Sequence, residues 1–198
     1  MPRKPRQLVD GGYYHLIARG NNRLYLFQQA KGGYDFFKAL LAESKKKYQW
    51  KLSHYCLMGN HIHLLGWVEK GQELPRLMQF LLFEYSRWYR LKMKYVGHLW
   101  QGRYKSPRIE KESYFLECGR YIERNPLRAG IVEKAEDYLW SSYRYYAFGM
   151  SDELVDEDPY YLGIGADAKS RQEKYREFIK LPGPYDKLVD ELLLKAHF

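Results

Sequence analysis

The sequence predicts an α+β fold, in which helices pack on an antiparallel sheet of the ferredoxin-like, split βαβ type and a C-terminal extension follows. The order of segments between residues 13 and 125 is strand, helix, strand, strand, helix, strand, helix. The strand segments are short and rich in aromatic and branched residues, whereas apolar residues recur at helical spacing in the longer segments. A hydrophobic content of 45% in 198 residues is sufficient for a core.

The first half of the chain predicts a strand, a helix and a β-hairpin, at residues 13–19, 34–49 and 51–68. A glycine and two asparagines end the strand, and the helix has apolar residues at helical spacing. In the hairpin, Gly59 and Asn60 form a two-residue turn signal between two apolar runs. The hairpin is therefore expected to place residues 51–58 opposite residues 61–68.

The second half predicts a long amphipathic helix at 74–95, an edge strand at 104–110 and a helix at 113–125. The long helix opens near Pro75, a favourable residue for a first helical turn. The proline within the strand favours a place at the edge of the sheet. Pro126 is expected to stop the last helix, because the residue before a proline is biased away from helical geometry.

The chain after residue 137 predicts three segments with different characters. Residues 138–149 are expected to close the main unit, an acidic loop follows at 151–159, and residues 170–181 have a helical pattern. Positive charge is concentrated in the first part of the sequence, where residues 1–110 carry 20 Lys and Arg against 7 Asp and Glu. Residues 151–198 carry 7 basic against 11 acidic residues.

This composition favours a polyanionic partner. A basic surface attracts nucleic acid and gains affinity from counterion release. The 20 tyrosines and 5 tryptophans add flat side chains on which unpaired bases can stack. No run of 18 apolar residues and no apolar N-terminal segment are present, and the two cysteines do not form a disulfide framework. We therefore expect no membrane contact and a cytoplasmic, nucleoid-associated location.

Two of the six histidines are one residue apart, in the apolar run at 61–68. His61 and His63 share one face of the predicted strand, about 7 Å apart along it, and can converge on one metal ion. Across the hairpin, Cys56 is expected to lie opposite His63. The alternative is two half-buried histidines, each with a hydrogen-bond partner, and the pair alone does not exclude it.

The helix at 113–125 offers further ligands and a nucleophile. Tyr121 and Asn125 are four residues apart and share one helical face. An amide oxygen is a suitable ligand for Mg²⁺ or Mn²⁺, and a tyrosine one turn away could act as a nucleophile near that ion. The alternative is an ordinary core stripe that ends at an Asn-Pro sequence.

Five sequence motifs, in the same order, resemble those of the bacterial REP-associated tyrosine transposases, which are related to the single-tyrosine transposases of insertion sequences. The sequence MGNHIHLL at 58–65 resembles the histidine–hydrophobic–histidine (HUH) motif of single-strand DNA nucleases with a tyrosine nucleophile. The other motifs are at 13–23, 98–106, 120–132 and 140–143. The resemblance covers roughly residues 10–150, and residues 151–198 match nothing in it.

The resemblance implies roles for four residues. Tyr121 is expected to attack DNA, and His61 and His63 to bind Mg²⁺ or Mn²⁺. In the insertion-sequence relatives a glutamine four residues after the tyrosine completes the metal site. Asn125 has this position here, as in the REP-associated branch, and its shorter side chain leaves direct metal ligation open.

Six residues beside the first strand and the predicted edge strand are assigned to DNA binding, with a solvated charged surface as the alternative. They are Arg19, Asn21, Arg23, Arg103, Lys105 and Arg108.

The function implied is a metal-dependent single-strand DNA endonuclease and strand transferase that forms a 5′-phosphotyrosine intermediate. Its expected partner is hairpin-containing repetitive extragenic DNA, and it is expected to act as a monomer or homodimer. Residues 1–150 would form the nuclease/transposase domain, and residues 151–198 an acidic loop with a helical extension. Two alternatives stay open: a catalytically inert single-stranded nucleic-acid-binding module, and a zinc site made of Cys56, His61 and His63.

Overall fold

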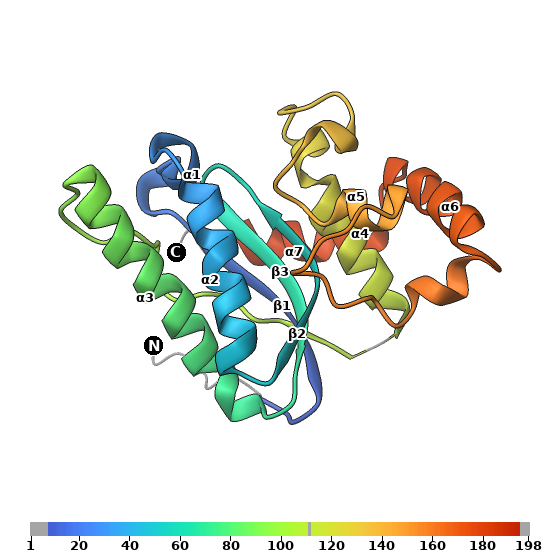
Figure 1. Ribbon diagram of the computed structural model, residues 1–198, viewed down its shortest axis with the longest axis horizontal. Helices are drawn as coiled ribbons and strands as arrows, with labels where there is room; N and C mark the ends of the chain where they lie inside the picture. Colours follow the sequence, from blue (N-terminus) through green and yellow to red (C-terminus); the bar gives the residue numbers. More distant parts are fainter. Residues whose placement is uncertain (1–7, 111, 195–198) are drawn as a thin grey trace.

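A computed structural model of the protein describes residues 8–110 and 112–194. Its centre is a four-stranded sheet with helices on both faces, and the C-terminal helices lie beyond one of these faces (Figure 1). Within the described residues, no helix combines the length and the apolar character needed to cross a membrane.

The sheet has the strand order β2-β3-β1-β4, and each strand is antiparallel to its neighbours. The strands are β1 (Gly12–Arg19), β2 (Trp50–Leu57), β3 (His61–Val68) and β4 (Arg108–Ile109). This is the strand order of a ferredoxin-like sheet, so the predicted fold is confirmed. The edge strand β4 is much shorter than the predicted segment 104–110. Lys105 makes only an isolated bridge to Ile17, and Pro107 has no backbone N–H for a ladder.

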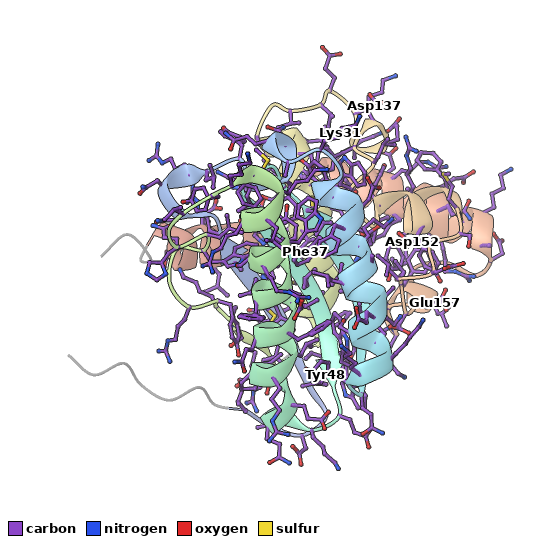
Figure 2. All side chains as sticks on the ribbon, turned by 60° about the vertical axis from the view of Figure 1, so that its left-hand side comes forward. Lys31, Phe37, Tyr48, Asp137, Asp152 and Glu157 are labelled. Atoms are coloured by element: carbon purple, nitrogen blue, oxygen red, sulfur yellow. The ribbon has the colours of Figure 1, made fainter. Side chains whose placement is uncertain are left out.

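Two long helices cover one face of the sheet, and shorter α-helices and α4 complete the part of the chain that the structure describes. The helices are α1 (Leu26–Gln29), α2 (Gly33–Lys47), α3 (Leu74–Met93), α4 (Glu112–Arg128), α5 (Tyr143–Phe148), α6 (Ala168–Lys180) and α7 (Pro184–Leu194). In Figure 2, α2 and α3 lie side by side, and Phe37 lies at the seam between them. Its ring is fully buried and meets the Tyr85 ring at a centroid distance of 5.4 Å.

The opposite face of the sheet is covered by α4, which packs on β2, β3 and β4. Phe115, Cys118 and Ile122 of this helix form a second core with Leu65 of the sheet. The helix passes unusually close to β2 at Gly119. A Cβ atom at this position would lie 2.7 Å from the His54 ring, so only glycine permits this approach.

The α4 helix does not stop before Pro126, and the predicted boundary was wrong. It continues to Arg128 with the proline inside it. Pro126 has no N–H to donate to the Ile122 carbonyl one turn earlier. The side-chain amide of Asn125 points back into this turn and donates to the Tyr121 carbonyl at 2.9 Å and, more weakly, towards the Ile122 carbonyl at 3.5 Å. Arg128 is therefore placed on the helical face that carries Tyr121.

Residues after 150 pack closely on the rest of the chain. The α6 and α7 helices contact α4, and α6 also packs on α5. The acidic segment runs along the outer edge of β2, where Leu52 and Asp156 exchange two hydrogen bonds of 2.8 Å each. This pairing protects the edge of the sheet. The division of the chain at residue 150 stays a prediction, and the contacts across it define how it can be tested.

Candidate active site

The β2–β3 hairpin has the predicted register. Cys56 lies opposite His63, and the backbone N–H of Met58 donates to the His61 carbonyl at 2.9 Å. His61 and His63 consequently share a face, and their ring centroids are 4.9 Å apart. Ile62, between them, points to the opposite face and joins the core under α2 and α3.

Each histidine of the pair uses its Nδ1 atom in a hydrogen bond. His61 Nδ1 donates to the Asn60 side-chain oxygen at 2.6 Å, and His63 Nδ1 lies 2.9 Å from Nε2 of His15. The Nε2 atom of His63 is fully buried, and the described residues offer it no hydrogen-bond partner. A buried nitrogen without a partner is unfavourable in a purely structural histidine, so this atom points to a ligand.

All three imidazoles are neutral at neutral pH. Burial, followed by the charge of Arg19, lowers the pKa of His61 to about 4. Burial lowers the pKa of His15 to about 3 and moves the pKa of His63 well below its usual value. Metal ions bind the neutral form of imidazole, so the pair is in the protonation state that a metal site requires.

Tyr121 lies over this pair because α4 crosses the same face of the sheet. Its ring centroid is 5.7 Å from that of His63, and its side chain is almost completely buried. Its hydroxyl donates to the Asp190 carboxylate of α7 at 3.2 Å. Burial, and then the charge of Asp190, raise the pKa of Tyr121, whereas Arg128 over its ring lowers it. The phenol is thus protonated at neutral pH.

The residues of β1, β3, α4 and α7 enclose a pocket of about 250 Å³. Its lining residues are Arg19, Met58, His61, Tyr121, Asn125, Arg128, Ala129 and Asp190. Four of these were predicted as site residues from the sequence, and His63 lies directly behind them. The amide nitrogen of Asn125 is bonded to helix carbonyls, which leaves its amide oxygen available. One chain therefore supplies the tyrosine, the histidine pair and the amide.

The residues assigned to DNA binding are not all in this pocket. Only Arg19 lines it. Asn21 lines a separate pocket of about 530 Å³ together with Arg90, His98 and Trp100. The two pockets therefore neither support nor contradict the assignment of these residues to DNA binding.

Four of the assigned residues lie outside both pockets. Arg23 is exposed at the end of a short 3-10 helix and Arg103 is exposed on a loop. Lys105 lies beside β1 at the sheet edge, and Arg108 is paired with Glu110. The assignment of the six residues to DNA binding stays a prediction.

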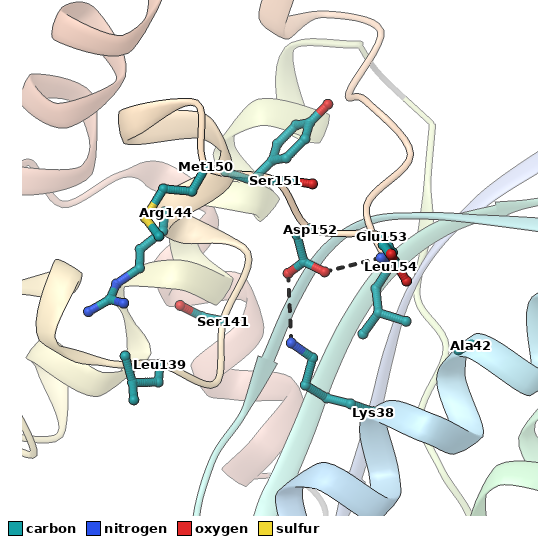
Figure 3. Close-up of a pocket in the computed structure, with 11 residues that line it drawn as sticks. Lys38, Ala42, Leu139, Ser141, Arg144, Met150, Ser151, Asp152, Glu153 and Leu154 are labelled. Carbon is teal, nitrogen blue, oxygen red and sulfur yellow. Dashed lines mark hydrogen bonds and ion pairs between the residues drawn. The ribbon is translucent and has the colours of Figure 1, made fainter.

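A third pocket, of about 440 Å³, lies between α2 and the segment that follows α4 (Figure 3). The carboxylate of Asp152 lines this pocket, 4.0 Å from the Lys38 amine, and accepts a hydrogen bond from the Leu154 N–H at 3.1 Å. None of the site residues predicted from the sequence lines this pocket.

The zinc alternative finds no support in the arrangement of side chains. Among the residues that the structure describes, no three His, Cys, Asp or Glu side chains form a group that could hold a metal ion. Cys56 is buried, its thiol donates to the Met58 sulfur at 3.6 Å, and burial raises its pKa.

Sequence reasoning missed four residues of the site. His15 shares the strand face of Arg19, a pattern that could have identified it. Arg128 is seven residues after Tyr121 and was missed because the helix was expected to end at Pro126. Tyr185 and Asp190 had no signal, since they are more than 60 residues from Tyr121 in a region with no recognised motif.

Comparison with known families agrees with this geometry. The family described as "Transposase IS200 like" matches residues 8–125, more than half of the chain. The chain belongs to this family. It is therefore a transposase, an enzyme that nicks and rejoins DNA.

One solved structure shows the same fold. A REP-associated tyrosine transposase, determined bound to a REP hairpin, has a TM-score of 0.63 and 17% identity, covering 80% of this chain and 93% of that chain. A candidate transposase from Deinococcus radiodurans has a TM-score of 0.41 and 21% identity, covering 62% of this chain and 96% of that chain. No curated protein matches the chain significantly.

Proposed function

We propose that this transposase is a metal-dependent single-strand DNA endonuclease and strand transferase that acts on hairpin-containing DNA through a covalent bond to Tyr121. The observation that carries this proposal is the position of Tyr121 over a neutral histidine pair whose buried Nε2 atom has no partner among the described residues. An inert binding module would leave this arrangement without a purpose.

The donor set fits a divalent metal ion. His61 and His63 would hold it through their Nε2 atoms, and Asn125 through its amide oxygen. Two nitrogens and one oxygen suit Mn²⁺, and Mg²⁺ accepts the oxygen ligand readily. When bound, such an ion supplies positive charge for the oxygens of the scissile phosphate.

In the proposed reaction, side chains of this protein cleave the phosphodiester bond. Tyr121 loses its proton and its phenolate oxygen attacks the phosphorus, forming a P–O bond to the tyrosine. The bond from phosphorus to the 3′-oxygen breaks, and this oxygen leaves as a 3′-hydroxyl after taking up a proton. The 5′-phosphotyrosine bond keeps the phosphodiester energy, so a second 3′-hydroxyl can reverse the step. Arg128 and Arg19 lie in the same pocket and suit the negative phosphate.

The proposed DNA partner is a single strand that contains a hairpin, such as repetitive extragenic DNA. The excess of basic residues at 1–110 and the many aromatic side chains support binding of a strand with unpaired bases. The fold is shared with a transposase whose structure contains a REP hairpin. Because one chain supplies the whole pocket, a monomer is sufficient for cleavage.

The test is formation of a covalent protein–DNA adduct. The protein is incubated with Mn²⁺ or Mg²⁺ and a labelled hairpin oligonucleotide from the DNA that flanks its gene. We expect a band of slower migration in denaturing gels, and mass spectrometry should locate the nucleotide on Tyr121. Tyr121→Phe removes one oxygen and little volume, so DNA binding should persist while the adduct and cleavage disappear.

Tyr114→Phe is the matched control, since Tyr114 is on the same helix and its side chain is 39% exposed. This variant should form the adduct at the wild-type rate. An adduct on another residue, or undiminished cleavage by Tyr121→Phe, would contradict the assignment. Tight binding of hairpin DNA with no cleavage under any metal condition would favour the inert binding module.

A further inference from the structure

Behind the histidine pair, a chain of buried hydrogen bonds connects β3 to α7. His63 Nδ1 lies 2.9 Å from His15 Nε2, and His15 Nδ1 lies 3.2 Å from the Tyr185 hydroxyl. The two imidazoles are fully buried, and Tyr185 is 2% exposed. The Tyr185 hydroxyl is also within hydrogen-bonding reach of the Cys118 thiol. A histidine of the proposed metal site is thereby linked, through one imidazole, to the C-terminal helix.

The protons in this chain can be arranged in two ways. In one, Tyr185 donates to His15, His15 donates to His63, and His63 carries its remaining proton on Nε2. This leaves a buried N–H without an acceptor, a rare and unfavourable state. In the other, His63 donates from Nδ1 to His15, His15 donates to Tyr185, and Tyr185 donates to Cys118. The second arrangement leaves only a lone pair on His63 Nε2.

The position of Tyr185 is well anchored. It lies in the first turn of α7, and two ion pairs hold this helix on α4. Arg124 pairs with Asp186 at 3.1 Å, and Arg128 pairs with Asp190 at 2.5 Å. The Tyr185 hydroxyl is therefore fixed relative to the sheet. A hydrogen-bond acceptor can select one tautomer of the histidines only if its own position is fixed.

We propose that His15 and Tyr185 are positioning residues that hold the proton of His63 on Nδ1, so that Nε2 offers its lone pair to a divalent metal ion. Histidine ligands in metal sites commonly have such partners, which set the tautomer and the ring orientation. The proposal rests on the proposed function and extends it, because it makes the C-terminal helix a part of the metal site.

The test begins with metal-free protein. Long-range ¹H–¹⁵N NMR spectra of protein with ¹⁵N-labelled histidine distinguish a protonated Nδ1 from a protonated Nε2. We expect His63 to carry its proton on Nδ1 in the wild type. Tyr185→Phe removes the terminal acceptor, so both arrangements then leave one N–H unpaired and we expect a mixture. Binding of Mn²⁺, measured by electron paramagnetic resonance, should weaken about 10- to 100-fold in this variant.

Tyr161→Phe is the matched control. Its hydroxyl is also buried in the C-terminal region and donates to the Tyr146 carbonyl at 2.6 Å, but it has no link to His63. This variant should retain the wild-type tautomer and Mn²⁺ affinity.

A wild-type His63 protonated on Nε2, or a Tyr185→Phe variant with unchanged Mn²⁺ affinity, would overturn the proposal. The wild-type spectrum decides the tautomer even if the variant does not fold. The Nδ1 tautomer in a protein that binds no Mn²⁺ would support the positioning role of Tyr185 while contradicting the proposed metal-dependent function.

Discussion

Two polar clusters with buried histidines lie on the same face of the sheet, under α4: a pocket cluster of three histidines and a second cluster around His54, and they differ in charge. In the pocket cluster, His15 and His63 are hydrogen-bonded to each other and His61 packs on His63; burial, with Arg19 near His61 and Arg128 near His63, lowers the pKa of all three. In the second cluster, His54 of β2 lies between two carboxylates, 2.8 Å from Glu123 and 3.0 Å from Asp158.

The carboxylates of Glu123 and Asp158 explain this difference in charge. Burial alone would lower the pKa of His54, but the charges and hydrogen bonds of Glu123 and Asp158 outweigh it and raise this pKa to about 9. Glu123 is satisfied on both oxygens, since the hydroxyls of Ser142 and Tyr175 also donate to it. The charged cluster therefore has no free site for a ligand. His15, His54 and His63 are equally buried, so the difference in their pKa follows from the partners that surround them.

Truncation after Gly149 should have the largest effect, because it removes residues from both clusters. The charged cluster would lose Asp158 and Tyr175, and His54 and Glu123 would become exposed or mismatched. Although the sequence suggested that the main unit would fold alone, these contacts favour loss of cooperative unfolding, measured by circular dichroism on heating. A chain that ends at Leu194 is the control. A truncated protein with a sharp transition would support a boundary at residue 150.

His63→Ala should remove activity with little loss of stability. We expect the nicking rate to fall on the order of 10³-fold, as when one group that stabilises transition-state charge is removed. The change also removes the buried Nε2 that has no partner among the described residues, so the loss of unfolding free energy should stay within about 2 kcal/mol. Single-turnover nicking and urea unfolding measure the two effects. Near-normal nicking would return His63 to an ordinary core role.

Glu123→Gln should have the opposite profile. Replacing one partner of a buried ion pair destabilises a protein by about 3–5 kcal/mol, and Tyr175 and Ser142 would also lose a charged acceptor. Any loss of activity should follow from the fraction of protein that is unfolded. Glu133→Gln, at an exposed site of the same charge, should change stability little. A difference below about 1 kcal/mol between the two variants would show that the buried pair is not stabilising.

The sheet and its two helices could be predicted from the sequence because local patterns determine them. The turn at Gly59 and Asn60 sets the hairpin register, and therefore the shared face of His61 and His63. The end of α4 could not be predicted, because the amide of Asn125 folds back on the turn before Pro126, donating to the Tyr121 carbonyl at 2.9 Å and reaching towards the Ile122 carbonyl at 3.5 Å. Local sequence patterns do not include side-chain contacts of this kind, so they placed the end of the helix too early.

The candidate site was predictable only where neighbours in sequence are neighbours in space. Tyr121 and Asn125 share a helical face, and the structure brings both into one pocket. The partners His15, Tyr185 and Asp190 come from distant segments, and a single sequence contains no signal for such pairings. For the same reason the charged cluster of His54, which joins β2, α4 and the acidic loop, was not foreseen.

The pH dependence of stability should show both clusters at once. His61 has a pKa of about 4 in the folded protein, well below its value of about 6.5 in the unfolded chain. Between roughly pH 6.5 and 4 it takes up a proton only on unfolding, so stability should decrease as the pH is lowered through this window. His54 is raised to about 9, so its contribution is complete below pH 6.5 and is lost as pH rises through 9. Melting temperatures from pH 4 to 10 measure both limbs. In His54→Gln the alkaline decline should become shallower, and an unchanged alkaline limb would contradict a charged His54.

Asp190→Asn should have the smallest effect and a positive one. The carboxylate accepts the hydrogen bond of the Tyr121 hydroxyl, pairs with Arg128, and lines the pocket proposed to hold the scissile phosphate. It thus competes with the phosphate for these partners and raises the pKa of the nucleophile. Asparagine keeps the shape without the charge, so we expect nicking to rise by several fold, or about 1 kcal/mol. Glu191→Gln, at the neighbouring acid on α7, is the control for the same change of net charge on this helix. A lower rate in Asp190→Asn would instead show that Asp190 accepts the proton from Tyr121, because an amide cannot take this proton.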